Sequence, residues 1–570
     1  MPTEKCGAVF FNDNKMKLKI TTALLLACMT ATMMATERTD AEKKLVAEQI
    51  LHQSVGHRAG TLHTLKTLIQ QDMLTVIGHE QEGFVVVANN DEFSAVVGYS
   101  QVPFTSFPPA LEWYLAAANQ TMQDMVANHV RRTNIPPSAE YPSSLGPLLT
   151  TTWDQGSPYN KLCPGGNGSS TRLYPTGCVA TALAQIMKYH NYPIKGNGEH
   201  QYSFQPSSGD GRIIEANFGE TTYEWDKMLD NYKSSYTDEE ALAVATLMLH
   251  CGVAVDMGYT ASGSGAYGVE ACQGLKKYFN YNKNTRLYTR NYYSAEAWMQ
   301  MIYKELNQYG PIYYSGVNPS SGGHAFVLEG YDETGLVRIN WGWGGSSNGL
   351  FDIALLNPSG SQYSAEQQMI LKLDPSVETP YESQIVAETL TFTIPSTKKS
   401  VTITGRVYNA GAEKFAGQLV CVLQNTADRS ITTLRTSDEM AMEPITNGQY
   451  WIKDFSLPAN SLSSVANGTY RLYVGSRTAD DSSWQLVRPK EGEINSYVIT
   501  KTDEGITWEE CRTDLWSIGV PTSILPVVKS MPNTNAPLRF YDFQGREVNA
   551  GTKGLVIRKQ GNDVKKVVVR

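Results

Sequence analysis

Apolar residues recur at three- and four-residue intervals in the middle of the chain. Val179, Ala182, Leu183, Ile186 and Met187 give one apolar face to a helix predicted over residues 178–190. Similar patterns predict helices at 238–251, 268–279 and 294–309. Short β-branched and aromatic runs then predict strands at 312–315, 325–329, 335–340, 349–353 and 368–373. Helices followed by strands favour an α+β domain in which the first helix faces the strands across a cleft.

The segments on either side of this domain have other patterns. Upstream, we expect helices at 45–51 and 111–130 and strands at 83–88 and 94–99, with a turn at 89–91. Downstream of Pro375, short alternating strands are expected at 385–394, 400–408, 417–423, 450–457 and 468–475. Their spacing predicts a β-sandwich of immunoglobulin type. Residues 521–537 are a proline-containing linker, and 538–570 contain three short strands with turns at Gly545 and Gly561.

The first 35 residues have the pattern of an export signal. Lys17 and Lys19 precede an apolar run that ends near Ala35 and is too short to span a membrane. We therefore expect a signal peptide over 1–35 with its true start at Met16. The residues from Leu25 to Cys28 also fit a bacterial lipoprotein cleavage box, but we favour an ordinary signal peptide that contains a cysteine.

Composition and charge argue against several classes of function. A net charge of −8 on 570 residues, with no basic block, argues against nucleic acid or an anionic membrane as partner. The nine histidines form no H-E-x-x-H motif and the eight cysteines no C-x-x-C motif, so no metal site is expected. Gly263 to Gly268 fits G-x-G-x-x-G, but it lacks the preceding apolar strand and the following acid of a dinucleotide site. We expect no cofactor.

Cys178 is the candidate nucleophile. It follows Gly177 where the helix begins, and the free amides and dipole of a helix N-terminus favour a thiolate. The alternative is a small buried packing residue, which is the commoner role of such a cysteine. Cys163 lies in a loop without this helix support and is a poorer candidate.

His324 is the candidate base. It lies 146 residues after Cys178, at the head of an apolar strand and directly after Gly323. In papain-type enzymes the histidine and asparagine lie about 130–150 residues downstream of the cysteine. Gln155 lies upstream of Cys178, where it can supply a side-chain donor to an oxyanion hole.

The group that orients His324 has two candidates. Asn340 could accept the imidazole N–H through its side-chain carbonyl oxygen, and we favour it. Trp341 could accept the same N–H through its backbone carbonyl while its ring shields the pair from water. An Asn-Trp pair at a strand end is also compatible with a simple turn and a packed aromatic. The sequence does not separate Asn340 from Trp341.

Four blocks together resemble the streptopain family of secreted bacterial cysteine peptidases. They are Trp153 to Pro164, Gly177 to His190, Gly323-His324, and Asn340 to Gly345. The resemblance spans residues 45–375 and implies an inhibitory propeptide over 36–145 and a papain-like peptidase domain over 146–376. It also implies that Cys178 attacks the substrate, that His324 transfers the proton, and that Gln155 stabilises the oxyanion.

The same resemblance implies where substrate and propeptide act. Ser264, Gly323 and Trp343 are expected to border the substrate cleft, and an apolar residue is expected two positions before the cut. The propeptide would keep the enzyme inactive until it is cleaved between 131 and 145, where the sequence is polar and Pro-rich. The sandwich module would occupy 380–520, followed by the 521–537 linker and a 538–570 β segment.

The final segment resembles the C-terminal sorting domains of type IX secretion substrates. If this holds, the secretion machinery is a further partner, and the protein ends outside the cell or on its surface. An edge hairpin of the β-sandwich is the alternative. We therefore expect a secreted zymogen of a cysteine endopeptidase that acts on proteins or peptides. The alternative is a catalytically silent adhesin on a peptidase-like fold.

Overall fold

The computed structural model describes most of the chain between residues 36 and 569. The described residues are 36–53, 63–130, 133–165, 172–205, 211–318, 322–356, 367–377, 382–445, 449–460, 462–481, 483–512 and 517–518, followed by strands at 538–541, 547–548, 554–560 and 563–569. The predicted signal peptide, Cys28 and the 521–537 linker lie outside the described residues. No described helix is long and apolar enough to cross a membrane.

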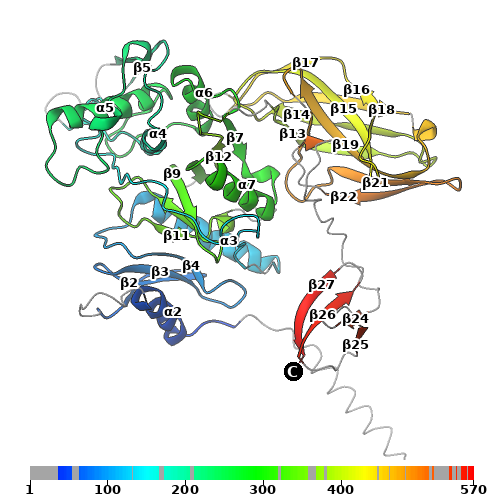
Figure 1. Ribbon diagram of the computed structural model, residues 1–570, viewed down its shortest axis with the longest axis horizontal. Helices are drawn as coiled ribbons and strands as arrows, with labels where there is room; N and C mark the ends of the chain where they lie inside the picture. Colours follow the sequence, from blue (N-terminus) through cyan, green and yellow to red (C-terminus); the bar gives the residue numbers. More distant parts are fainter. Residues whose placement is uncertain are drawn as a thin grey trace, which may run out of the picture.

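One antiparallel sheet of ten strands runs through the N-terminal segment and the predicted peptidase domain (Figure 1). Its strand order is β1-β2-β3-β4-β11-β10-β9-β8-β12-β7. β4 (Val96–Ser100) pairs antiparallel with β11 (Gly349–Phe351), which joins Gly98 to Phe351 and Tyr99 to Leu350. The N-terminal segment is therefore hydrogen-bonded to the domain that follows it.

The N-terminal segment (residues 36–145), called here the pro-domain after the role that the sequence predicts for it, has four strands and two helices among its described residues. The predicted helices and strands are found as α2 (Asp40–Gln53), β3 (Gly83–Ala88), β4 and α3 (Pro109–Ala127). Strands β1 (Lys66–Gln70) and β2 (Leu74–His79) were not predicted. β2 and β3 are buried almost throughout, because α2 covers one face of this sheet and α3 the other.

The next domain has all four predicted helices. They are α4 (Cys178–His190), α5 (Asp238–Val253), α6 (Gly268–Tyr278) and α7 (Ala295–Gln308). The predicted strands appear as β8 (Ile312–Asn318), β9 (Gly322–Tyr331), β10 (Val337–Asn340), β11 and β12 (Gln368–Leu371). Three strands were not predicted: β7 (Arg286–Thr289) and the hairpin of β5 (Glu199–Phe204) and β6 (Arg212–Asn217).

Two apolar cores lie on opposite faces of the central strands. Tyr313, Ala325 and Val327 face a core that contains α4 and α5. Tyr314 and Phe326, on the other face of the same strands, belong to a core that contains α3 and α7. The pro-domain helix α3 therefore packs on the face of β8 and β9 opposite the α4 helix.

The C-terminal module has two β-sheets that share one core. The three-stranded sheet contains β13 (Ile385–Thr393), β14 (Val401–Asn409) and β18 (Lys453–Ala459). The larger sheet contains β15 (Phe415–Asn425), β16 (Ile431–Thr436), β17 (Met440–Met442), β19 (Gly468–Thr478), β20 (Trp484–Leu486), β21 (Ser496–Lys501), β22 (Ile506–Cys511) and β23 (Ser517–Ile518). Side chains from both sheets form one cluster, so the module is a β-sandwich. Its immunoglobulin type stays a prediction.

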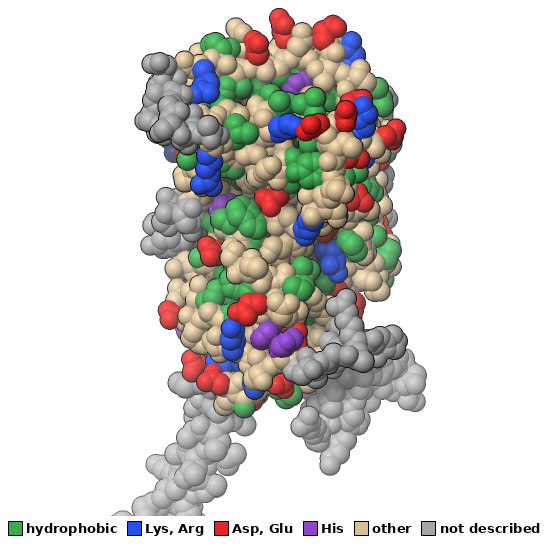
Figure 2. Space-filling model, turned by 90° about the vertical axis from the view of Figure 1, so that its left-hand side faces the viewer, with side chains coloured by type: hydrophobic (Ala, Val, Ile, Leu, Met, Phe, Trp, Pro, Cys, Tyr) green, Lys and Arg blue, Asp and Glu red, His purple; other side chains and the backbone are tan. Residues whose placement is uncertain are grey.

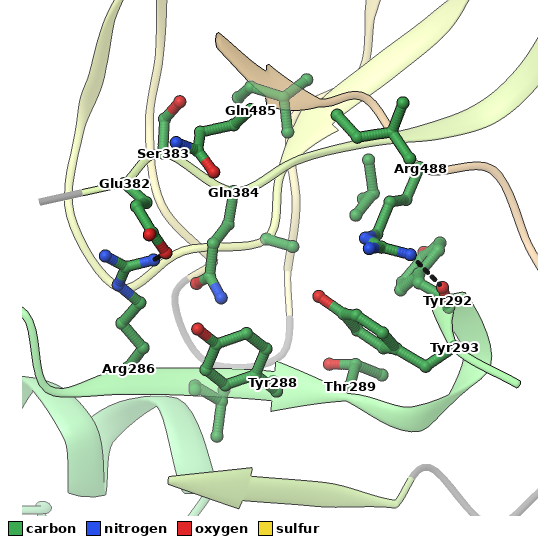
Figure 3. Close-up of a pocket in the computed structure, with 15 residues that line it drawn as sticks. Arg286, Tyr288, Thr289, Tyr292, Tyr293, Glu382, Ser383, Gln384, Gln485 and Arg488 are labelled. Carbon is green, nitrogen blue, oxygen red and sulfur yellow. Dashed lines mark hydrogen bonds and ion pairs between the residues drawn. The ribbon is translucent and has the colours of Figure 1, made fainter. Parts of the chain in front are cut away.

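The β-sandwich contacts the peptidase domain beside β7 through charged and aromatic side chains (Figure 3). Arg286 forms an ion pair with Glu382 at 2.6 Å. Arg488 reaches back from the sandwich, stacks over the Tyr293 ring at 4.3 Å and donates to the Tyr292 carbonyl. Because the peptidase-domain partners come from the edge strand β7 and the turn that follows it, the sandwich covers this end of the ten-stranded sheet.

The last residues form a separate four-stranded sheet, in the order β25-β24-β26-β27. Its strands are β24 (Leu538–Tyr541), β25 (Glu547–Val548), β26 (Gly554–Gln560) and β27 (Asp563–Val569). Four strands replace the three that were predicted. On the molecular face in Figure 2, acidic and basic side chains are interspersed with no block of one sign.

Candidate active site

A cavity of about 780 Å³ lies where α4, β9 and the pro-domain helix α3 meet. All the predicted site residues except Asn340 line it: Gln155, Cys178, Ser264, Gly323, His324, Trp341 and Trp343. Pro109 and Ala110, at the start of α3, also line the cavity. The structure therefore brings together residues 186 positions apart in sequence (341 − 155) and places the pro-domain against them.

Cys178 is the first residue of α4, as the sequence predicts. The residue before it, Gly177, has φ of 91°, a conformation that favours glycine. A Cβ on Gly177 would lie 2.8 Å from the Met257 sulfur and 2.9 Å from the Ser264 carbonyl oxygen. Glycine is required here for both reasons, and it allows the chain to turn sharply into the helix.

The thiol of Cys178 is not activated in this arrangement. Burial raises its pKa, although the backbone N–H groups of Ala325, Val179 and Cys178 act in the opposite direction. The side chain keeps partial exposure at the cavity wall, but protein surrounds the sulfur. The predicted lowering of the pKa at the helix N-terminus is therefore wrong for this state, since desolvation outweighs the helix amides.

His324 lies on β9, directly opposite Gly316 of β8. Its side chain is half-buried, and burial lowers its pKa. Its ring centroid is 6.5 Å from that of Trp113 in α3. Within the described ranges no hydrogen bond joins His324 to Cys178, so the predicted dyad is not formed while α3 is in place.

Gln155 lies in a loop that is stabilised by the side chain of the preceding residue, Asp154. The Asp154 carboxylate accepts hydrogen bonds from the backbone N–H of Gln155 at 2.6 Å and of Gly156 at 3.4 Å. The Gln155 carbonyl accepts from the Thr176 N–H, two residues before Cys178. These bonds fix the Gln155 backbone against the nucleophile turn and leave its amide at the cavity wall. Sequence reasoning missed Asp154, although it stands in the same Trp-Asp-Gln-Gly block.

Asn340 does not orient His324 in this structure. Its side-chain NH₂ donates to the Thr151 carbonyl at 2.9 Å, and its oxygen accepts from the Gly342 N–H at 3.1 Å. It also bonds the Gln185 amide, and it is only 1% exposed. We correct the preference for Asn340, because both ends of its amide bind α4 and the neighbouring loops.

Replacing Asn340 with alanine is expected to destabilise the fold by about 2–3 kcal/mol, since it leaves buried partners unsatisfied. Denaturant unfolding measures this change. Turnover per titrated active site should fall by no more than about threefold, because Asn340 is not expected to touch the reacting groups. A stably folded Asn340→Ala protein with strongly reduced turnover per site would instead give Asn340 a role in the chemistry.

Trp341 is fully buried and uses both of its N–H groups elsewhere. Its backbone N–H donates to Asn348 and its indole N–H to the Ser347 carbonyl. In the described part of the chain, nothing donates to its carbonyl oxygen. Its ring packs against Phe326 and Phe351 with centroids about 5 Å apart.

The three predicted substrate-binding residues all line the cavity, but Ser264 differs from expectation. Its hydroxyl donates to the Pro175 carbonyl at 2.7 Å, and the residue is only 7% exposed. Ser264 thus holds the turn that leads to Cys178 and has little capacity left for a peptide. Gly323 is exposed and Trp343 half-buried.

The described cysteines are free thiols, and burial raises the pKa of Cys163 to about 12. Within the described ranges, no three His, Cys, Asp or Glu side chains come together as a metal site.

Comparisons with known proteins agree with this geometry. Residues 153–351 match the family model described as the peptidase C10 family. Streptopain of Streptococcus pyogenes is 33% identical over 292 residues, which cover 49% of this chain and 73% of streptopain. The chain belongs to the peptidase C10 family. Its peptidase domain is therefore a cysteine peptidase domain.

Two further proteins are each similar to about half of the chain. The thiol protease/hemagglutinin PrtT of Porphyromonas gingivalis is 34% identical over 319 residues, which cover 52% of this chain but only 36% of PrtT. A solved fragment of Prevotella intermedia prointerpain A is 40% identical, with a TM-score of 0.51, and covers 55% of this chain and 98% of the fragment. This C10 chain therefore spans about a third of the length of PrtT. The structural similarity supports the papain-like C10 fold.

Proposed function

We propose that this C10 protein is the secreted zymogen of a cysteine endopeptidase. The observation that carries the proposal is one cavity that is lined by Cys178, His324 and Gln155 and also by the start of α3. The direct test incubates the purified protein with casein and follows self-cleavage and casein hydrolysis together. Removal of the pro-domain should precede casein hydrolysis, and lack of both activities would reject the proposal.

The reaction follows from the chemistry of these groups. Once α3 has left, His324 turns toward Cys178 and takes its proton, and the thiolate attacks the scissile carbonyl carbon. The carbonyl π electrons move to oxygen, and the imidazolium then protonates the leaving amine as the C–N bond breaks. Water attacks the thioester with His324 as base, which releases the acid and restores the thiol.

Trp341 is the better candidate to orient His324. Its carbonyl oxygen has no donor among the described residues, whereas both ends of the Asn340 amide are occupied. A backbone carbonyl that accepts one imidazole N–H fixes the tautomer whose other nitrogen faces the thiol. The Trp341 ring, packed between Phe326 and Phe351, would exclude water from this bond.

Gln155→Ala should lower kcat by about 100-fold or more and change KM little. The Gln155 amide and the Cys178 backbone N–H would donate to the oxyanion, and one such donor contributes about 3 kcal/mol in the transition state. Steady-state kinetics on a peptide substrate measure both constants. Gln424→Ala in the β-sandwich is a matched control. An equal rise in KM with unchanged kcat would instead make Gln155 a ground-state binding residue.

The pro-domain would act as the inhibitor, with cleavage between 131 and 145. Release also has to break the β4–β11 pairing, which joins Gly98 to Phe351 and Tyr99 to Leu350. Export by the 1–35 signal and sorting by 538–570 through type IX secretion complete the proposal. Membership of a cysteine peptidase family over 153–351 favours the enzyme over a silent adhesin.

A further inference from the structure

Trp113 of the pro-domain fills a hollow in the peptidase sheet next to His324. The hollow exists because Gly316 has no side chain. A Cβ on Gly316 would lie 2.4 Å from the Trp113 ring and 2.7 Å from the side-chain nitrogen of Gln367. The indole and the Gln367 amide thus meet directly above the Gly316 backbone.

The strand register explains why these groups meet. Gly316 pairs with His324 across β8 and β9, and Ser315 pairs with Gln368 across β8 and β12. Gln367 therefore continues the row that contains Gly316 and His324, and neighbours across a sheet share one face. The hollow has Gly316 as its floor, with Gln367 on one side and His324 on the other. Phe326, two residues after His324, lies on the same face, 6.4 Å from the Trp113 ring.

The polar groups of this contact are unsatisfied. The Trp113 indole N–H is buried and has no hydrogen-bond partner, and both polar atoms of the Gln367 amide are likewise buried without one. A buried amide without hydrogen-bond partners is destabilising. The pro-domain therefore matches the hollow in shape but leaves its amide unpaired.

We propose that this hollow is a substrate subsite for an aromatic side chain on the leaving-amine side of the scissile bond, with Gln367 selecting rings that carry a polar group. This rests on the proposed peptidase function. The Cys178 sulfur accepts from the backbone N–H of Ala325, whose side chain faces the opposite side of β9 from the hollow, whereas His324, the residue before it, shares the face of the hollow. In the proposed reaction His324 protonates the leaving amine, so the leaving amine lies next to His324. The substrate residues after the cut therefore extend past His324 toward the face of β9 that carries the hollow.

The chemistry of the hollow selects the side chain. Its floor is flat backbone and one wall is Phe326, which suits a planar ring packed at a tilt, as Trp113 packs now. The Gln367 amide can donate to a tyrosine hydroxyl or accept from an indole N–H. Phenylalanine fits the shape but leaves the amide unpaired, so tyrosine and tryptophan are favoured over phenylalanine, and all three over alanine.

The test uses the processed wild-type enzyme and quenched peptides that differ only at the first or second position after the cut. Mass spectrometry confirms the cut position. At one of the two positions, we expect kcat/KM for the Tyr and Trp peptides to exceed that for the Ala peptide by about tenfold or more. A tenfold ratio corresponds to about 1.4 kcal/mol of differential binding. Equal values for all four residues at both positions would overturn the subsite, while cleavage of the Ala peptide would still support the peptidase.

Two variants separate shape from hydrogen bonding. Gly316→Ala places a methyl group where the ring lies, so the aromatic preference should fall to about twofold or less. Gln367→Leu should bring kcat/KM for the Tyr and Trp peptides down to the level of the Phe peptide. Gln424→Leu, in the β-sandwich, should keep the wild-type preference. An unchanged preference in Gln367→Leu would remove Gln367 from the proposal even if Gly316→Ala does not fold.

Discussion

The Cys178→Ala protein is expected to remain a full-length precursor and to hydrolyse casein at least about 10⁴-fold more slowly than the wild type. Removal of a covalent nucleophile eliminates the thioester route, and little activity remains from binding and the oxyanion hole alone. The fold should be unaffected, because alanine occupies a helix N1 position well and no described side chain hydrogen-bonds to the Cys178 sulfur. Gel analysis of self-cleavage and casein hydrolysis measure the two activities.

The matched control is Cys163→Ala. Cys163 is also a free thiol, but it is buried and its pKa is raised to about 12. This control should self-process and hydrolyse casein at close to the wild-type rate. Normal self-cleavage by Cys178→Ala would show that another residue, or another protease in the preparation, performs the reaction.

Gly98→Val is expected to make the zymogen process itself about tenfold faster or more. Gly98 lies on β4, where the pro-domain pairs with β11, and an added Cβ would lie 2.4 Å from the Phe351 ring. Overpacking of this kind costs about 1–3 kcal/mol, and each 1.4 kcal/mol is a factor of ten in the docking equilibrium. The processed enzyme lacks Gly98, so its kcat and KM should match those of the wild type.

The time course of self-cleavage at fixed protein concentration measures this effect, with Leu45→Ala as control. Leu45 lies in the same pro-domain but is 54% exposed, so its loss should change little. A circular dichroism spectrum checks that Gly98→Val is folded. Unchanged processing of a folded Gly98→Val protein would mean that the β4–β11 pairing does not hold the enzyme inactive.

Local sequence patterns predicted the parts of the fold that carry strong periodicity. The α4 helix and strands β8 to β12 have apolar faces that are buried, so their positions follow from the sequence. The β5–β6 hairpin was missed because β5 alternates exposed and half-buried residues, including Glu199, His200 and Gln201, and has no apolar run. The β4–β11 pairing joins strands about 250 residues apart in the chain, and no local pattern specifies such a partner.

The sequence predicted which residues form the candidate site, but not how these residues are arranged while the pro-domain is bound. The motif spacing located Cys178, His324 and Gln155, which line one cavity. The sequence could not show that α3 places Trp113 near His324, or that burial raises the Cys178 pKa. Asn340 was preferred because an asparagine follows the histidine in papain-like enzymes, but only the structure shows that its amide is already bonded at both ends.

The central claim is that the Cys178 thiol is held inactive by the pro-domain and becomes a reactive thiolate when the pro-domain leaves. A short pulse of iodoacetamide at a series of pH values tests this claim. Intact mass separates the precursor from the processed form, and peptide mapping identifies alkylation at Cys178. Because burial raises the thiol pKa in the precursor, its thiolate forms only above the ordinary thiol value of about 8.5. At about pH 6 the processed form should be alkylated at Cys178 within the pulse and the precursor should not. Equal alkylation of both forms at that pH would contradict the account.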